Sequence, residues 1–220
     1  MSGQRLTFLI TSGSTKEYID PVRYISNDSS GKMGAALAGQ ALIKKHKVIF
    51  ICGKSDVLPP DNINLIRVIS AADMFKSVKK YFNSADIIIG AAAVADFTPV
   101  SCNRHKIKKG TDVPVIKLKK TPDIIAYCGK NKKNKVVAGF ALETENLYAN
   151  AVKKLQSKKL DIIIANGKES MGADTASVCL INREGESVSL KNAGKNKIAG
   201  KIINETIRIF KNNKTGKKIS

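Results

Sequence analysis

The chain of 220 residues is long enough to bury a core of its own, and its hydrophobic content of 43% is typical of a globular protein. No run approaches 18 consecutive apolar residues, which argues against a membrane span.

The formal net charge is +20, Lys greatly outnumbers Arg, and Trp is absent. A nucleic-acid-binding module would usually cluster Arg and aromatic residues on one element. We therefore interpret the charge as a lysine-rich solvated surface, compatible with the steering of a polyanionic small substrate.

The N-terminal sequence MSGQRLTFLITSG leads directly into a strand-like segment and has no small-residue cleavage site. We therefore expect an unprocessed, cytoplasmic protein. The cysteines lie far apart and form no CxxC pair: Cys52, Cys102, Cys128 and Cys179. Each is predicted to be a small apolar residue or a free thiol rather than a zinc ligand or disulfide partner.

Apolar, strand-like runs alternate along the chain with amphipathic, helix-like runs. The predicted strands cover residues 6–13, 47–53, 63–70, 85–97, 135–143 and 160–167. The predicted helices cover residues 32–45, 72–82, 122–129, 146–159 and 195–211, with Pro122 expected at the first helical position of its helix. This alternation predicts βαβ units and thus a three-layer, Rossmann-like α/β fold, in which a mostly parallel sheet has helices on both faces.

Two segments depart from the alternation. Residues 98–120 lose helical periodicity and carry many basic residues, which predicts a basic flap, or arm, after the fourth strand. Residues 177–190 predict a C-terminal hairpin that turns at Arg183-Glu184-Gly185. Since no internal repeat or composition break interrupts the chain, we expect one domain over residues 1–211, followed by a basic, frayed tail at 212–220.

Ligands of such a sheet bind at the carboxyl ends of the strands. The predicted loops there are rich in Gly, Ala and Ser: TSGSTKEYIDPVRYISNDSSGKMG, GAAAVADF, GFALETEN and ANGKESMG. Short side chains let a phosphate or a base approach the backbone closely. The familiar phosphate motifs are absent, because GxGxxG does not occur and Val48 stands where a P-loop ending in Gly53-Lys54-Ser55 would need glycine.

The segment SSGKMG, residues 29–34, opens the predicted helix at 32–45. Ser29, Ser30 and the backbone amides from Gly31 to Gly34 would therefore lie at the positive end of a helix, where anions bind. The alternative is a serine N-cap with a glycine turn and no ligand. The length and polarity of the preceding loop favour the anion site.

Other chemistries find less support in the sequence. GAAAVAD resembles the Asn-Ala-Gly stretch of short-chain dehydrogenases, but no tyrosine has the lysine four residues later that their catalytic Tyr-x-x-x-Lys requires. His46 and His105 lie among lysines without a nucleophile pattern, so a hydrolytic triad is not indicated. The run Lys106-Ile107-Lys108-Lys109 is either a solvated face or a functional part of the flap, and its position ten residues beyond Asp96 favours the second interpretation.

Several long segments, spread nearly from end to end, together resemble phosphopantothenoylcysteine synthetase, also called phosphopantothenate–cysteine ligase. They are TSGSTKEYIDPVRYISNDSSGKMG, AAAVADF, KIKK, TPDII, GFALETENL and KKLDIIIAN. The resemblance implies that 4′-phosphopantothenate and L-cysteine are joined through an acyl-nucleotide. The nucleotide is usually CTP in bacteria, ATP remains open, and Mg²⁺ is carried mainly by the triphosphate.

The resemblance also implies partners and absences. The family acts as a homodimer in which the flap reaches the partner's site. The flavin-dependent decarboxylase often fused in front of this unit is not part of the sequence, so no flavin is expected, and neither a nucleic acid nor a membrane is an expected partner.

By the same resemblance, Asn27 and Lys106 are the catalytic residues, and Asn27, Ala92 and Lys106 bind phosphopantothenate. An amide such as that of Asn27 can donate to a developing oxyanion, and Lys106 would balance charge where carboxylate meets triphosphate. The resemblance implies that nucleotide binding involves Lys106 and further residues: Gly13, Ser29, Gly31, Gly34, Gly90, Ala91, Ala92, Asp96, Pro122, Asp123, Ile124, Ile125, Phe140, Lys154 and Lys158. The last two lie four apart on one helix face, which could equally be solvated surface.

Overall fold

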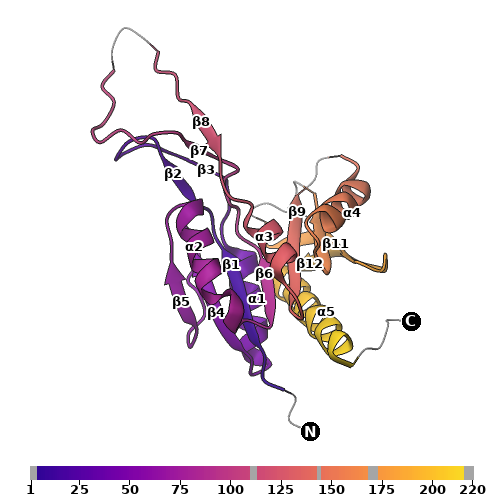
Figure 1. Ribbon diagram of the computed structural model, residues 1–220. Coiled ribbons are helices and arrows are strands. Elements are labelled where there is room, and N and C mark those ends of the chain that lie inside the picture. The colour runs from indigo at the N-terminus through magenta and orange to yellow at the C-terminus, as the bar shows by residue number, and fades with distance from the viewer. Residues whose placement is uncertain (1–3, 110–112, 143–144, 168–172, 216–220) are drawn as a thin grey trace.

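The computed structural model describes residues 4–109, 113–142, 145–167 and 173–215, and an eight-stranded sheet runs through them (Figure 1). The strand order across the sheet is β12-β11-β10-β9-β6-β1-β4-β5. These strands are β1 (Thr7–Ser12), β4 (Lys47–Cys52), β5 (Asn64–Arg67), β6 (Ile87–Gly90), β9 (Val136–Leu142), β10 (Ile162–Asn166), β11 (Thr175–Asn182) and β12 (Ser187–Gly194). Strands β5, β4, β1, β6, β9 and β10 run parallel to one another. Strand β11 is antiparallel to β10, and β12 is antiparallel to β11.

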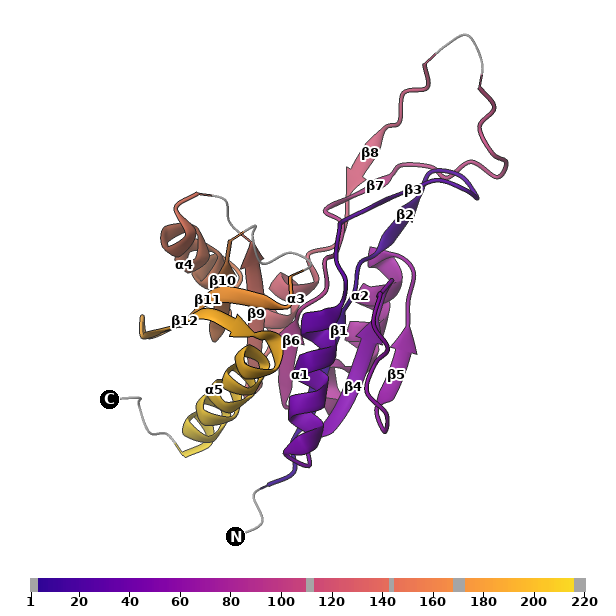
Figure 2. The same cartoon turned by 180° about the vertical axis from the view of Figure 1, so that it is seen from behind.

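Helices cover both faces of the sheet, as the predicted Rossmann-like fold requires (Figures 1 and 2). They are α1 (Lys32–Ile43), α2 (Ala71–Tyr81), α3 (Ile124–Asn131), α4 (Leu147–Ser157) and α5 (Lys195–Thr215), with a short 3₁₀ turn at Phe82–Ser84. Alternate residues of a strand point to opposite faces. Phe8 and Ile10 of β1 therefore pack with α1 and α5, while Leu9 packs with α2, α3 and α4. The three-layer prediction is confirmed.

The structure corrects two predicted helix ends. Helix α3 begins at Ile124, and Asp123 is its N-cap, accepting a hydrogen bond from the Ala126 amide at 3.0 Å. Pro122 therefore precedes the cap instead of occupying the first helical position. Helix α5 continues to Thr215, into the segment predicted to be a frayed tail; Ile209 and Phe210 pack into the core, and the last turn after them is largely exposed. Residues 216–220 of that tail lie outside the described residues.

The connection from β1 to α1, expected to be only a polar loop, contains two short antiparallel strands, β2 (Lys16–Tyr18) and β3 (Tyr24–Ser26). Glu17 of β2 is buried, and its carboxylate accepts a hydrogen bond from the Ala71 amide at the start of α2, at 2.8 Å. Strands of three residues carry too little periodicity to be predicted. Their stability comes from such contacts with distant parts of the chain.

The predicted flap is confirmed as an arm that leaves the sheet through a two-stranded stem, β7 (Phe97–Pro99) and β8 (Leu118–Lys120) (Figure 1). The turn between β2 and β3 holds one side of it. The Asn103 amide donates to the Ile19 carbonyl at 2.9 Å, and the Ile107 amide donates to Asp20 Oδ2 at 3.2 Å. Ile107 is thereby fixed immediately after Lys106.

Asp20 is the centre of this attachment. Its buried carboxylate accepts hydrogen bonds from the Val22 and Arg23 amides and from the Arg23 guanidinium, which itself donates to the Ile107 carbonyl at 2.8 Å. The Arg23 guanidinium, followed by the backbone donors, holds the pKa of Asp20 far below its usual range, although burial acts in the opposite direction. The carboxylate that attaches the flap is therefore ionised throughout the neutral and mildly acidic range.

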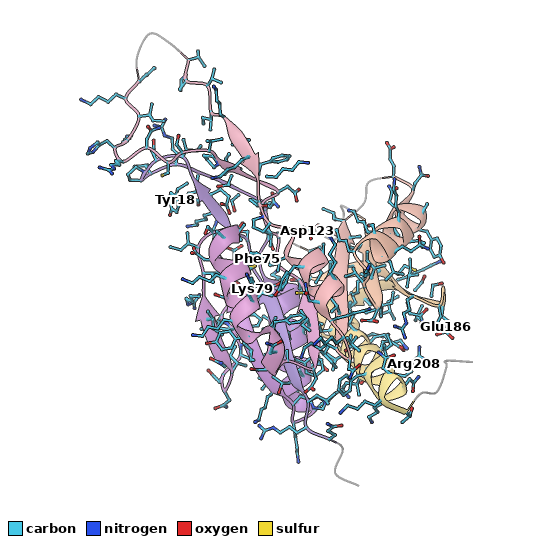
Figure 3. The ribbon with its side chains drawn as sticks, viewed as in Figure 1. Tyr18, Phe75, Lys79, Asp123, Glu186 and Arg208 are labelled. Atoms are coloured by element: carbon cyan, nitrogen blue, oxygen red, sulfur yellow. The ribbon has the colours of Figure 1, made fainter. Side chains whose placement is uncertain are left out.

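The hairpin predicted at residues 177–190 is present as β11 and β12, and its turn packs near the end of α5. Arg208 Nη2 of α5 lies 3.2 Å from Glu186 Oε2 at the hairpin turn (Figure 3). Among the described residues, no helix is both long and apolar enough to cross a membrane.

At the amino ends of the strands, Asp161 ties three parts of the chain together. Its fully buried carboxylate accepts hydrogen bonds from the Val137 amide at 2.9 Å, from Lys132 Nζ at 2.6 Å and from Arg183 Nη1 at 3.3 Å.

Replacing Asp161 with Ala leaves a buried amide and a half-buried ammonium without their acceptor. We expect a loss of about 3 kcal/mol in the free energy of unfolding, measured by urea denaturation. The control Glu184→Ala, which removes only an exposed contact with Arg183, should cost at most about 1 kcal/mol. Equal losses in the two variants would contradict the assigned role of Asp161.

A second prediction concerns the attachment of the flap. Asp20→Ala removes the acceptor of the Ile107 amide and the counter-ion of Arg23, so the segment from Arg104 to Lys109 should open more often. Limited trypsin digestion should cut this segment several-fold faster than in the wild type, because proteases cleave locally opened chain. Asp28→Ala, which removes an exposed carboxylate from the same connection, serves as the control. Unchanged cleavage in Asp20→Ala would show that Asp20 does not hold the flap.

Candidate functional site

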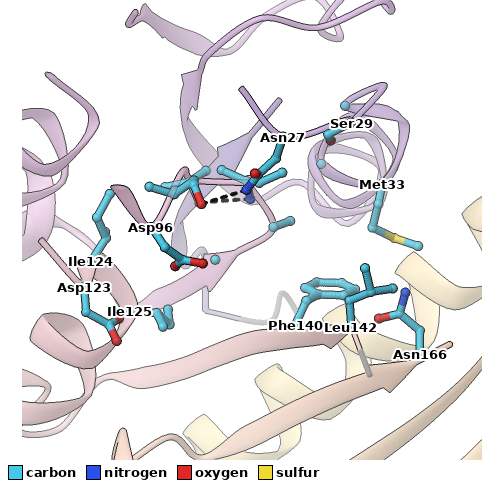
Figure 4. A pocket seen from close by; sticks show the side chains of 18 of the residues that line it. Asn27, Ser29, Met33, Asp96, Asp123, Ile124, Ile125, Phe140, Leu142 and Asn166 are labelled. Atoms are coloured by element: carbon cyan, nitrogen blue, oxygen red, sulfur yellow. Dashed lines mark hydrogen bonds between the residues drawn. The ribbon is translucent and has the colours of Figure 1, made fainter. Parts of the chain in front are cut away.

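A cleft of about 1000 Å³ opens at the carboxyl ends of the central strands (Figure 4). The loop before α1 forms one wall, the small residues after β6 form the floor, and the start of α3 forms the opposite wall. This is the edge at which open parallel sheets bind ligands. The cleft therefore lies at the end of the sheet where the sequence predicts the ligand site.

Most of the predicted site residues line this cleft, although they come from segments far apart in the chain. They are Asn27, Ser29, Gly31, Gly34, Gly90, Ala91, Ala92, Asp96, Pro122, Asp123, Ile124, Ile125, Phe140, Lys154 and Lys158. Side chains from both walls, such as Asn27, Asp96 and Ile125, face the same space, with Phe140 below them (Figure 4).

Two predicted residues, Gly13 and Lys106, are not among the residues that line the cleft. Gly13 serves the turn after β1, since its φ is +71° and a Cβ there would stand 2.3 Å from the Lys54 carbonyl oxygen. Lys106 is exposed on the flap, beside the Ile107 attachment described above. This lysine therefore lies away from the cleft of its own chain.

The segment SSGKMG forms the start of α1 as predicted, but the serine N-cap offered as an alternative is wrong. The N-cap residue is Gly31, with φ of +75°, and it has no side chain with which to cap the helix. Gly34 lets α1 approach β1, because a Cβ there would lie 2.1 Å from Ser12 Oγ. Residues 31–34 at the start of α1 line the cleft, and the Lys32 amide donates to Ser30 Oγ at 3.5 Å. A helix start in such a place favours the binding of anions.

Asn27 is oriented by a contact across the cleft wall. Its Nδ2 donates to the Val94 carbonyl at 3.0 Å, which joins the loop before α1 to the loop after β6 (Figure 4). The partner is 67 residues away, so the bond does more than complete the local turn. An amide nitrogen has two hydrogens. One N–H is used by Val94, and the second can donate to a ligand.

The opposite wall holds a cation in a fixed place. Lys158 Nζ lies 3.0 Å from Asp123 Oδ2, and Asp123 is also the N-cap of α3. Lys158 is therefore positioned by an ion pair rather than only solvated. Beneath them Cys128 is buried, and burial, followed by the nearby Asp123 charge, raises the pKa of its thiol to about 12. The thiol stays protonated at neutral pH and cannot serve as a nucleophile.

The cleft contains further polar residues that the sequence did not single out. The most prominent are Lys32, Lys195 and Asn166, together with Thr121, whose hydroxyl donates to the Ala95 carbonyl at 2.6 Å. Lys32 stands inside the predicted SSGKMG segment, so its position was available as a signal. Lys195 is more than 160 positions away from it, and only the fold brings it to the same cleft.

The chemistry of the cleft suits a polyanion with an attached ring. Lysines and the start of α1 supply positive charge, small residues allow close approach to the backbone, and Phe140 offers an aromatic face. Within the described residues, no three or more His, Cys, Asp or Glu side chains gather into a possible metal site.

Comparison with known proteins gives a consistent result. The family described as the DNA/pantothenate metabolism flavoprotein C-terminal domain matches residues 2–210. Two curated relatives, both named coenzyme A biosynthesis bifunctional protein CoaBC, come from Borreliella burgdorferi and Bacillus subtilis. They are 45% identical over 179 residues and 39% identical over 208 residues, which cover 80% and 92% of this chain. These matches cover 46% and 51% of the relatives, so the chain spans about half of their length.

A solved structure agrees with the fold. The crystal structure of the C-terminal domain of coenzyme A biosynthesis bifunctional protein CoaBC superimposes with a TM-score of 0.83 at 33% identity, covering 96% of this chain and 98% of that one. Sequence and fold thus agree over nearly the whole chain. The protein belongs to the family of the DNA/pantothenate metabolism flavoprotein C-terminal domain.

Proposed function

We propose that this chain is a phosphopantothenate–cysteine ligase of coenzyme A biosynthesis, with residues 1–211 acting as one domain and CTP preferred over ATP. One observation carries the proposal: five of the six segments that resemble this ligase contribute residues to a single cleft at the carboxyl ends of the strands, KIKK on the flap being the exception. The names of the CoaBC relatives agree with it. A cytoplasmic location stays a prediction from the sequence.

In the proposed reaction, a carboxylate oxygen of 4′-phosphopantothenate attacks the α-phosphorus of CTP, and pyrophosphate leaves with the electrons of the broken P–O bond. The amine of L-cysteine then attacks the acyl carbon and loses a proton, and CMP leaves. Activation is needed because a free carboxylate would have to expel oxide. No electron is transferred, so the reaction needs no flavin.

The residues of the cleft suggest how each part is held. The first turn of α1 would bind phosphate oxygens, and Asp96 would accept hydrogen bonds from ribose or base. Phe140 would lie beside the base, and Lys154 and Lys158 would make further contacts with the nucleotide. The second N–H of Asn27 would donate to the oxyanion that forms at the acyl carbon. The described residues offer no cluster that would hold Mg²⁺ by itself, so we derive no step through the metal, which would arrive with the triphosphate.

Lys106 enters this scheme through a second copy of the chain. It is exposed on a flap that leads away from its own cleft, and the flap exposes apolar side chains such as Val100 and Leu118, 53% and 45% exposed. We infer that two chains pair through their flaps and that each Lys106 completes the cleft of the partner. A C₂ pair would exchange the two flaps reciprocally.

The decisive experiment is an assay of pyrophosphate release by the purified protein. Release should require a nucleoside triphosphate and 4′-phosphopantothenate together, and amide formation should also require L-cysteine. Parallel assays with CTP and ATP should give the higher kcat/KM for CTP. Release that is unchanged when phosphopantothenate is omitted would overturn the proposed reaction, and a higher kcat/KM for ATP would overturn only the nucleotide preference.

Lys106→Met keeps the length of the side chain and deletes its charge. Loss of such a positioned contact should lower the rate about 10²–10³-fold, equivalent to about 2–4 kcal/mol of transition-state stabilisation. The fold should be unaffected because the side chain is exposed. Lys108→Met, two residues further along the same exposed run, is the matched control. Near-normal pyrophosphate release by Lys106→Met would show that Lys106 is only a solvated surface residue with no role in the reaction.

Asn27→Asp replaces a donor by a nearly isosteric acceptor, which cannot donate to an oxyanion. We expect amide formation to fall more than nucleotide transfer, so the acyl-nucleotide should accumulate in quenched mixtures analysed by mass spectrometry. Because the introduced carboxylate would also face the Val94 carbonyl, a thermal unfolding measurement should accompany the assay. Wild-type amide formation at saturating substrates would exclude the catalytic assignment.

The same two variants test the pairing of chains. If Lys106 acts in the partner's cleft, mixed dimers of Lys106→Met and Asn27→Asp contain one cleft with both native residues. Mixing the two inactive proteins under exchange conditions should restore about a quarter of the wild-type activity for random pairing of identical interfaces. Absence of any recovery, with exchange confirmed by differently tagged chains, would place Lys106 in its own cleft.

A further inference from the structure

A cationic cluster lies at the far wall of the cleft, outside the residues that the resemblance assigns. It consists of Lys32, the first residue of α1, Lys195, the first residue of α5, and Asp174, just before β11. Lys32 Nζ lies 2.6 Å from Asp174 Oδ1, and the Lys195 amide donates to the Asp174 carbonyl at 3.2 Å. Both lysines line the cleft.

The fold forces the two lysines together. Helices α1 and α5 pack side by side on the same face of the sheet (Figure 2), and both begin at the end where the strands open into the cleft. Each helix start adds the partial positive charge of its first backbone amides. Among the described residues, two ammonium groups and two helix starts thus lie near the Asp174 carboxylate.

A bound anion would stabilise the charged form of Lys195. Burial lowers the pKa of Lys195, repulsion from Lys32 lowers it further, and the Asp174 charge acts in the opposite direction. The Asp174 side chain is 87% exposed, so it can turn to water when another anion takes its place. The carboxylate therefore keeps Lys32 in position while the cleft is empty and can be displaced by a stronger ligand.

The location of the cluster indicates which part of a ligand reaches it. Met33, next to Lys32, and Asn166 stand on one side of the cleft, whereas Asp123, Ile124 and Ile125 stand on the other, with Phe140 between them (Figure 4). A nucleoside held by α3 and Phe140 therefore has this cluster across the cleft from it. Charge and position both fit the end of a phosphorylated ligand.

We propose that Lys32 and Lys195 form a phosphoryl-binding subsite of the cleft, with Asp174 as its exchangeable counter-ion. This inference rests on the proposed ligase function. The phosphoryl group belongs either to the β and γ positions of the nucleotide, which leave as pyrophosphate, or to the 4′-phosphate of phosphopantothenate. Both sources offer the same chemistry, an exposed dianionic oxygen cluster that two ammonium groups can contact.

Steady-state kinetics of Lys32→Met and Lys195→Met test the subsite, with Lys197→Met as the matched control. Lys197 is an exposed lysine on the same first turn of α5 and does not line the cleft. Each test variant should raise the KM of one phosphorylated substrate about 10–100-fold, the loss expected for a charge-assisted hydrogen bond. The KM of L-cysteine should stay within about twofold, a split that a general loss of structure would not produce.

The two sources of the phosphoryl group give different results. A subsite for the nucleotide tail should raise the KM of CTP and weaken product inhibition by pyrophosphate. A subsite for the 4′-phosphate should raise the KM of phosphopantothenate and leave the much slower turnover of unphosphorylated pantothenate unchanged. Asp174→Asn, which removes the competing carboxylate, should lower the same KM that the lysine variants raise.

A binding measurement keeps the inference testable apart from the reaction. Calorimetric titration with inorganic pyrophosphate and inorganic phosphate should show binding to wild-type protein and to Lys197→Met, and at least tenfold weaker binding to Lys195→Met. If wild-type protein releases no pyrophosphate but this binding difference is present, the ligase function fails and the subsite stands. If both lysine variants match Lys197→Met in every KM, in product inhibition and in this titration, the subsite is excluded.

Discussion

The burial of a parallel sheet on both faces is the constraint on which this structure depends. Strands β1, β6 and β9 are apolar on both sides, so helices must cover both, and each helix must cross back to return the chain in the same direction. All carboxyl ends of these strands then meet at one edge. The loops that follow these strands are rich in Gly, Ala and Ser, and they lie together at this edge. The cleft forms between them.

The close packing of α1 and α3 against the sheet gives the cleft at this edge its shape. Gly34 brings α1 against Ser12 of β1, and Gly90 leaves room for Ile125 of α3, whose Cδ1 would lie 2.8 Å from a Cβ at that position. Larger residues at these places would push both helices away from the sheet. The starts of α1 and α3 would then no longer face each other across the cleft, although the secondary structure would be unchanged.

Electrostatics in the cleft is organised rather than merely positive. Lys158 pairs with Asp123 and Lys32 pairs with Asp174, so each ammonium group has a carboxylate beside it that favours one position. The net charge of +20 attracts polyanions over a distance, but only positioned cations discriminate among them. The buried Asp20 carboxylate has the corresponding role for the flap, because it fixes the backbone next to Lys106.

The sequence by itself determined the helices, the sheet strands and the edge of the sheet at which the cleft lies, since periodicity and turn residues are local properties of the chain. It also predicted the segment that opens α1. Only the tertiary structure decided that Gly13 serves a turn, that Lys106 lies away from its own cleft, and that Lys195 meets Lys32. These outcomes depend on contacts between residues far apart in sequence, and the burial and packing that create such contacts leave no pattern in a short segment.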